Sequence, residues 1–253
     1  MRFGVVGDVH GNIHALEACL AALGRLGYER LLAPGDVVGY GPRPNECVAR
    51  LRELDAVAVA GNHDLMAIGR LPARGLPPLQ RRTIEWTREA IDAGTRAYLE
   101  ALPLEAEPEP GLLMTHGGLG DPTRYVHDAA LARVELAHLD ERGSAARVLL
   151  LGHTHRAMAC SLHHEEEPAG TVALVAPPWV VNAGSVGQSR ERRPWARAAL
   201  IDTDSAEVSF LALDYDLDAT RRELRAAGLP PEACHLAPSF SARLRARVAR
   251  AAR

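Results

Sequence analysis

Eight polar residues with metal-binding or proton-transfer chemistry follow five apolar segments of the sequence. They are carboxylates, imidazoles and one amide: Asp8, His10, Asp36, Asn62, His63, His116, His153 and His155. These groups suit hard and borderline divalent ions such as manganese, iron, zinc or cobalt. No cysteine belongs to the set, which argues against a structural zinc site. The residue types therefore predict a divalent metal site.

The number of donors indicates two ions rather than one, because a single tetrahedral ion takes only four ligands. Seven donors, with one carboxylate shared, fit two ions about 3.5–4 Å apart, which can clamp a phosphoryl group and generate hydroxide at neutral pH. Each motif alone is ambiguous, since Gly35–Asp36 and Gly61–Asp64 also suit turns. The pair His153–His155 is more specific. The five signals together predict a dinuclear site for phosphoryl chemistry.

Strand-length apolar segments come before these residues. We expect strands at Arg2–Val6, Arg30–Ala33, Ala56–Ala60, Leu112–Thr115 and Arg147–Leu151. We expect helices at Ile13–Leu26, Asn45–Leu54, Pro78–Leu102 (with a break marked by Asp92 and Gly94) and Asp128–Arg142. This alternation predicts an α/β sheet with much parallel pairing. If the five strands share one sheet and run parallel, the polar residues converge at their carboxyl ends.

The last third of the chain is predicted to be richer in strands. Closely spaced segments suggest a second sheet with antiparallel pairs: Thr171–Ala176, Val180–Asn182, Ala196–Asp202 and Glu207–Leu213. A helix is expected at Leu217–Ala227, and the acidic run Glu165–Glu167 suggests a hairpin tip. Residues 239–253 carry five arginines and no acid. This segment suits either a solvated terminal helix or tail, or an arm for a phosphate-rich partner.

Composition sets broad limits on the class of protein. A chain of 253 residues with 47% hydrophobic residues can bury one sizeable core, and we expect one domain over residues 1–238. A net charge of −3 and 4% aromatic residues disfavour nucleic acid and membrane partners. The four cysteines are scattered, and Cys19 and Cys47 are expected to be buried thiols. Without a signal peptide or a long apolar run, we expect a cytoplasmic location.

Five motifs occur in an order that resembles the calcineurin-like metallophosphoesterase superfamily. They are GDVHGN at 7–12, GD at 35–36, GNHD at 61–64, THGG at 115–118 and GHTH at 152–155. GDVVGYGPRPNECV at 35–48 and NAGSVGQ at 182–188 look like a bacterial and archaeal branch of small stand-alone phosphoesterases. The resemblance implies a four-layer α/β/β/α sandwich of two mixed β-sheets, with the metal site at the carboxyl ends of the strands.

The resemblance also implies roles for the donors. Asp8, His10 and His155 would bind one ion, Asn62, His116 and His153 the other, and Asp36 would bridge them with a water or hydroxide. The bridging carboxylate is expected to use both oxygens. His63 would stabilise the phosphoryl oxygens or protonate the leaving group, with a purely structural role as the alternative. Manganese is the first expectation for both ions, with iron, zinc, cobalt or nickel as alternatives.

Three further residues are candidate substrate contacts. Asn12 is either a phosphate donor or the N-cap of the helix that begins at Ile13. Asp64 either orients His63 or caps the next turn. Arg190 is a candidate for binding phosphate, but its loop reads GSVGQSRER where relatives often read GSVGQPRDG. The role of the segment Ser189–Arg193 is therefore left open.

The second motif bears on the substrate. Protein Ser/Thr phosphatases of the superfamily carry GDxVDRG, in which an Asp orients the catalytic histidine and an Arg holds phosphate. Gly39 and Tyr40 replace these residues here, which disfavours protein dephosphorylation. We expect small phosphodiesters or nucleotides, including dinucleoside polyphosphates, as substrates. The alternatives are a protein or small-molecule phosphomonoester phosphatase, or a non-catalytic scaffold of the same fold, although the chain keeps all seven ligands and His63.

Overall fold

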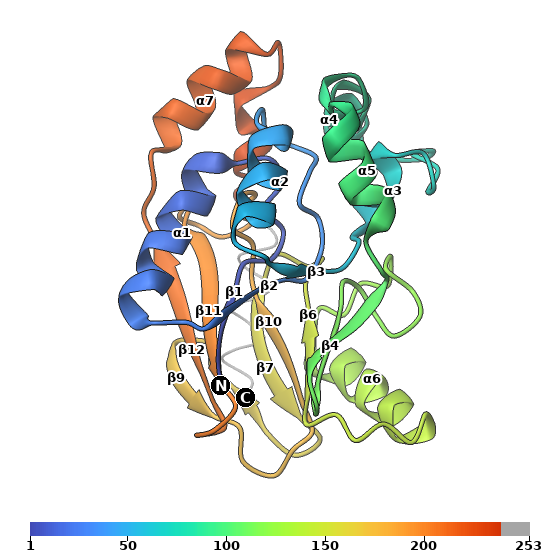
Figure 1. Ribbon diagram of the computed structural model, residues 1–253, viewed down its shortest axis with the longest axis vertical. Coiled ribbons are helices and arrows are strands. Elements are labelled where there is room, and N and C mark those ends of the chain that lie inside the picture. Colours follow the sequence, from blue (N-terminus) through green and yellow to red (C-terminus); the bar gives the residue numbers. More distant parts are fainter. Residues whose placement is uncertain (239–253) are drawn as a thin grey trace.

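Two β-sheets packed face to face form the centre of the protein. The computed structural model describes residues 1–238 (Figure 1). In this range the first sheet has the order β3-β2-β1-β11-β12-β9, with bounds β1 Arg2–Val5, β2 Arg30–Ala33, β3 Val57–Ala58, β9 Gly170–Ala173, β11 Ala196–Asp202 and β12 Glu207–Leu213. The second has the order β4-β5-β6-β10-β7-β8, with bounds β4 Glu105–Glu109, β5 Leu112–Thr115, β6 Val148–Leu151, β7 Ala157–Ser161, β8 Glu165–Glu166 and β10 Trp179–Ala183.

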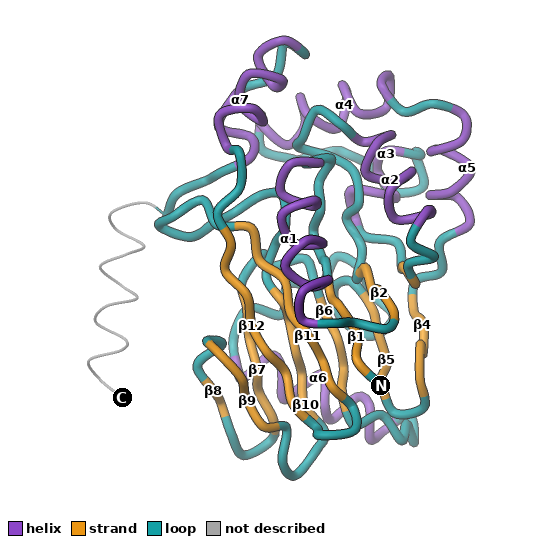
Figure 2. Tube along the Cα trace, turned by 60° about the vertical axis from the view of Figure 1, so that its left-hand side comes forward, coloured by secondary structure: helices purple, strands orange, loops and turns teal. Residues whose placement is uncertain are grey.

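Helices cover the outer faces of the two sheets and one end of the sandwich. Their bounds are α1 Ile13–Leu26, α2 Pro44–Glu53, α3 Asn62–Ala67, α4 Pro78–Ala90, α5 Ala93–Ala101, α6 Ala129–Glu141, α7 Leu217–Ala226 and a 3-10 helix η1 Pro231–Cys234. Helix α1 lies against the first sheet and contacts β11, as Figure 2 shows, whereas α6 packs on β7 and β10 of the second sheet. The four layers implied by the family resemblance are confirmed.

The alternation of apolar residues explains why both faces of each sheet are covered. In β2, Leu32 faces the core between the sheets, whereas Leu31 faces the core under α1. In β6, Leu150 faces the inter-sheet core, and Leu149 and Leu151 face α6. Successive side chains of a strand point to opposite faces, so strands that are apolar at every position are buried on both sides.

The expectation that the five strands share one sheet is wrong. Strands β1, β2 and β3 pair in parallel in the first sheet, and β5 and β6 pair in parallel in the second. The later strands also divide between the sheets, because β10 pairs with β6 while β11 pairs antiparallel with β1. Long-range pairing decides which sheet a strand joins, and local apolar patterns carry no information about it.

Several local predictions are confirmed, and others are not. The break at Asp92 separates α4 from α5, and all four cysteines are buried and free. Strands β4 and β7 and helix α3 were not predicted, and the acidic run at Glu165 begins a short edge strand rather than a hairpin tip. The arginine-rich segment 239–253 lies outside the described residues. Across residues 1–238, no helix is long and apolar enough to cross a membrane.

The packing between the sheets predicts a strong effect of truncation at Leu150. Leu150 is fully buried in the inter-sheet core, so Leu150→Ala should lower the free energy of unfolding by ~2–5 kcal/mol. Leu162→Ala is the matched control, because Leu162 is 46% exposed; its effect should stay within about 0.5 kcal/mol. Urea unfolding measures both variants, and equal losses would contradict this account of the core.

Candidate metal centre

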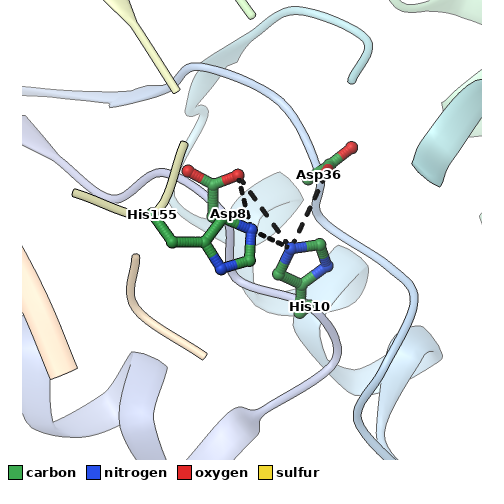
Figure 3. Close-up of side chains that lie close together, drawn as sticks. All are labelled: Asp8, His10, Asp36 and His155. Atoms are coloured by element: carbon green, nitrogen blue, oxygen red, sulfur yellow. Dashed lines mark hydrogen bonds and ion pairs between the residues drawn. The ribbon is translucent and has the colours of Figure 1, made fainter. Parts of the chain in front are cut away.

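Turns at the ends of strands from both sheets carry the predicted donors to one place. Asp8 and His10 follow β1, Asp36 follows β2, His116 follows β5, and His153 and His155 follow β6, while Asn62 begins α3 shortly after β3. Their ligand atoms form two groups, each within 4.8 Å: Asp8, His10, Asp36 and His155, and then Asp36, His116 and His153. Figure 3 shows the first group, with the imidazoles of His10 and His155 facing each other near the two carboxylates.

The backbone is strained at these turns. The φ angle is positive at Asp8 (51°), His10 (50°), Asp36 (55°), His153 (68°) and His155 (59°). Left-handed conformations cost non-glycine residues roughly 1–3 kcal/mol each and persist only where the surrounding structure enforces them. The concentration of strain at five of the predicted donors indicates a site whose geometry is held by the whole fold.

The imidazoles of His10 and His155 face each other through Nε2 atoms that carry no proton. Burial lowers the pKa of both rings well below the ordinary value, so each is neutral and has a single N–H. Nδ1 of His10 donates to the Val38 carbonyl at 3.1 Å, and Nδ1 of His155 donates to the Gln188 carbonyl at 2.7 Å. The two Nε2 atoms, which then both carry lone pairs, lie 3.0 Å apart. A cation shared by the two rings satisfies this arrangement.

The other two histidines are oriented in the same manner. Nδ1 of His116 contacts the Pro34 carbonyl at 2.7 Å, and its Nε2 lies 3.1 Å from Oδ1 of Asn62. Nε2 of His153 contacts the Thr123 carbonyl at 3.2 Å, which leaves Nδ1 available to bind a metal ion. A backbone carbonyl thus fixes one nitrogen of each of the four rings, as is usual for histidines that bind metal.

Asp36 lies between the two groups. Its Oδ2 is 3.6 Å from Nε2 of His10 and 3.3 Å from Nε2 of His116. Its Oδ1 accepts the backbone N–H of His63 at 2.7 Å, because the first turn of α3 needs an external acceptor. Oδ2 therefore faces both groups, while the expectation that both oxygens serve the ions stays a prediction. Oδ2 of Asp36 and Oδ2 of Asp8 are buried and have no hydrogen-bond partner among residues 1–238.

The charges of these side chains are strongly coupled. Burial raises the pKa of Asp8 to about 7, and the Asp36 carboxylate adds to this effect. Burial also opposes ionisation of Asp36, but the imidazoles of His116 and His63 hold its pKa well below the usual range. Burial opposes protonation of His116, but the two carboxylates outweigh it and raise its pKa to about 9. The buried carboxylates thus attract positive charge, which a proton or a divalent ion can supply.

Two of the predicted substrate contacts have structural roles. Asn12 is buried and caps α1, since its Oδ1 accepts the Ala15 N–H and its Nδ2 donates to Gly187 and Tyr215. The side chain therefore has no free donor for phosphate, and the capping alternative describes it. The carboxylate of Asp64 accepts the N–H groups of Val38 and Gly61, so Asp64 also fits its capping alternative and makes no hydrogen bond to His63.

Arg190 lies beside the metal-binding groups. Burial and then the charge of Arg190 lower the pKa of His155, whose Nδ1 is held by the carbonyl of Gln188, two residues before Arg190. Arg190 donates to Gln188 at 3.1 Å and to the Tyr125 hydroxyl at 2.9 Å, and it has no salt bridge within the described part of the chain. Sequence reasoning missed Tyr125 and Gln188. The signals were the position of Tyr125 in the loop 118–126, directly after the fourth motif, and that of Gln188 at the end of NAGSVGQ.

The geometry and the comparisons with known proteins agree. Residues 1–206 match the calcineurin-like phosphoesterase superfamily domain. The chain therefore belongs to this superfamily and is a metal-dependent phosphoesterase, a hydrolase that acts on phosphoric esters. The family uses divalent metals, and the buried groups of Asp and His residues fit that requirement.

Similar proteins span nearly the whole chain. A metallophosphoesterase from Sphaerobacter thermophilus has 31% sequence identity and a TM-score of 0.81, with coverage of 92% of this chain and 97% of the other. A hypothetical protein from Pyrococcus horikoshii OT3 has 20% identity and a TM-score of 0.76, with coverage of 92% and 96%, and so shares the fold. An uncharacterized protein from Methanocaldococcus jannaschii is 26% identical over 89% of this chain and 93% of its own length.

The contact between Gly61 and Asp36 generates a prediction about metal binding. A Cβ atom at Gly61 would collide with Oδ1 and the backbone nitrogen of Asp36, so Gly61→Ala should displace the carboxylate that faces both groups. We expect the variant to stay folded but to bind fewer ions than the wild type in equilibrium dialysis. Gly24→Ala in α1 is the matched control, because no atom lies within 4 Å of the added Cβ. Wild-type stoichiometry in Gly61→Ala would contradict the assigned position of Asp36.

Proposed function

We propose that the protein binds two divalent ions and hydrolyses small phosphodiesters or nucleotides, dinucleoside polyphosphates included. Asp8, His10 and His155 would hold one ion, and Asn62, His116 and His153 the other. Asp36 would be shared. The observation that carries this proposal is the pair of bare Nε2 atoms of His10 and His155, 3.0 Å apart. Manganese is the first expectation for the metal, and a cytoplasmic location stays a prediction from the sequence.

The chemistry follows from the donor set. Bound divalent ions would supply Lewis-acid activation of a water molecule and charge neutralisation for the phosphoryl oxygens. The chain supplies the rest, because the carbonyls of Val38, Pro34 and Gln188 hold the imidazoles in one tautomer and orientation. Neutral Asn62 limits the negative charge around the ions, which keeps the site attractive to an anionic substrate. Arg190, with its charge unpaired by any described carboxylate, is suited to binding a second phosphate oxygen or a neighbouring phosphate.

His63 is the proposed proton donor. Its imidazole is 3% exposed and lies 4.8 Å from the ring of His10, centroid to centroid. Nδ1 of His63 is buried and has no hydrogen-bond partner within residues 1–238, so the ring is not engaged in a structural hydrogen bond through that nitrogen. The arrival of a negatively charged phosphate would favour the protonated ring, which can then protonate the leaving group.

The alternatives are weaker on the same observations. A scaffold that had lost catalysis would have no need to keep strained turns at five donors, or to leave two carboxylate oxygens without hydrogen-bond partners among residues 1–238. A protein Ser/Thr phosphatase of this superfamily would carry Asp and Arg at the positions of Gly39 and Tyr40. A small-molecule phosphomonoesterase keeps the same metal chemistry and differs only in the substrate it prefers.

Asp36→Asn tests the shared carboxylate. The variant should lose roughly 10³-fold or more in kcat, because the charge that holds both ions is removed. The wild-type protein is loaded with manganese and assayed with a phosphomonoester, a phosphodiester and a dinucleoside tetraphosphate. The same assays with the zinc-loaded and cobalt-loaded protein show which metal gives the highest kcat. A wild-type protein that binds two ions and hydrolyses no substrate would contradict the proposed function, and a clear preference for the monoester would favour the phosphomonoesterase.

His63→Ala tests the proton donor through the leaving group. A dinucleoside monophosphate has a basic alkoxide leaving group, so the variant should lose ~10²–10⁴-fold in kcat with it. Bis-p-nitrophenyl phosphate needs little protonation and should lose less than about 10-fold. His163→Ala, in the exposed turn between β7 and β8, is the control for a surface histidine and should behave as the wild type with both substrates. Equal losses of His63→Ala with the two substrates would contradict the proton-donor role.

A further inference from the structure

The imidazole of His63 is oriented by packing rather than by a carboxylate. No residue in the described part of the chain hydrogen-bonds to its buried Nδ1. Gly39 lies directly against this nitrogen, because a Cβ atom built on Gly39 would be 2.5 Å from Nδ1 of His63. Gly39 also has a φ angle of 94°, a conformation that suits glycine. The space next to Nδ1 therefore has no room for a side chain that could hold the ring through a hydrogen bond.

Tyr40 supplies a large ring contact to His63. The ring centroids of the two residues are 4.8 Å apart at an interplanar angle of 31°. The Tyr40 ring also contacts the imidazole of His10 in an edge-to-face arrangement. The ring centroids are 4.7 Å apart and the interplanar angle is 87°. Tyr40 is 1% exposed and has a positive φ of 53°, which means that its backbone is strained in order to place the ring there.

Tyr40 also belongs to a separate apolar cluster of buried residues. We call this the cap cluster, and it packs Tyr40 against buried residues of α7 and the segment after it, namely Leu224, Leu229, Ala233 and Cys234. Trp86 of α4 packs against the same cluster. The Tyr40 hydroxyl is buried near the side chains of Gln80 and Arg190, but it forms no well-directed hydrogen bond with a described residue. The contribution of Tyr40 therefore comes from its ring, which is fixed between the cap cluster and the two imidazoles.

We propose that Tyr40 is a positioning residue that holds the imidazole of His63 beside the metal centre by ring packing. The inference rests on the proposed role of His63 and adds the device that orients it. Tyr40 has no part in proton transfer in this scheme, because its effect on the reaction passes through His63. Removal of the ring should therefore allow the imidazole to rotate without changing the number of ions bound.

A double-mutant cycle tests this proposal with the metal-loaded, full-length protein. Tyr40→Leu should lower kcat about 10- to 100-fold with the dinucleoside monophosphate, since part of the ~10²–10⁴-fold effect of proton donation is lost. In the His63→Ala background the same substitution should change kcat less than about threefold, because the group on which it acts is gone. The kcat of Tyr40→Phe should stay within about threefold of the wild-type value, since this substitution keeps the aromatic ring.

Two controls separate positioning from a general loss of structure. Leu136→Ala on α6 removes buried apolar volume from a cluster that contains neither Tyr40 nor His63, so it should lower the melting temperature and leave the loss of kcat below about threefold. The metal content of Tyr40→Leu should stay at the wild-type value. The inference is overturned if Tyr40→Leu loses metal, if its effect persists in the His63→Ala background, or if Tyr40→Phe is as impaired as Tyr40→Leu. Full activity of His63→Ala would instead refute the proposed role of His63.

Discussion

The metal centre is organised by buried carboxylate oxygens and imidazole nitrogens that are gathered around one point. Among residues 1–238, Oδ2 of Asp8 and Oδ2 of Asp36 have no hydrogen-bond partner, although Nε2 of His116 lies 3.3 Å from Oδ2 of Asp36. The Nε2 atoms of His10 and His155 face each other across 3.0 Å. Burial of an unpaired charge or acceptor costs several kcal/mol, so such a group of donors is stable only around positive charge. The strained turns, the backbone carbonyls that fix the imidazoles and the glycines that allow close approach all serve to keep these donors together.

The two-sheet architecture supplies the stiffness that this arrangement requires. One sheet delivers Asp8, His10 and Asp36, and the other delivers His116, His153 and His155. The inter-sheet core, which includes Phe3 and Leu150, fixes the distance between the two sets. Because protein cores are close-packed, a shift of one sheet relative to the other is resisted by many side chains at once. A site shared between two sheets is therefore held more rigidly than a site on a single loop.

His63 and Arg190, which lie beside the metal centre, are positioned by other kinds of contact than the proposed metal ligands. The four histidine donors are fixed by contacts with backbone carbonyls, and Asp8 and Asp36 accept backbone N–H groups. His63 is instead surrounded by rings and by Gly39. Arg190 is held by neutral partners, Gln188 and Tyr125, so its charge is available for an anion. This division fits the chemistry, since metal ligands need a fixed tautomer and a substrate-binding cation needs to stay free of carboxylates.

Local sequence determined the donors and most helices, because metal ligation restricts residue types and amphipathic periodicity is visible along the chain. The same motifs identified the family, which residues 1–206 confirm. Tertiary structure decided what depends on partners distant in sequence. It divided the five strands between two sheets, directed a single oxygen of Asp36 toward both groups of donors, and engaged Asn12 and Asp64 in caps. It also brought Tyr40 and Tyr125 to the site. Strand partners, hydrogen-bond acceptors and ring contacts are set by residues tens to hundreds of positions away, and no local pattern encodes them.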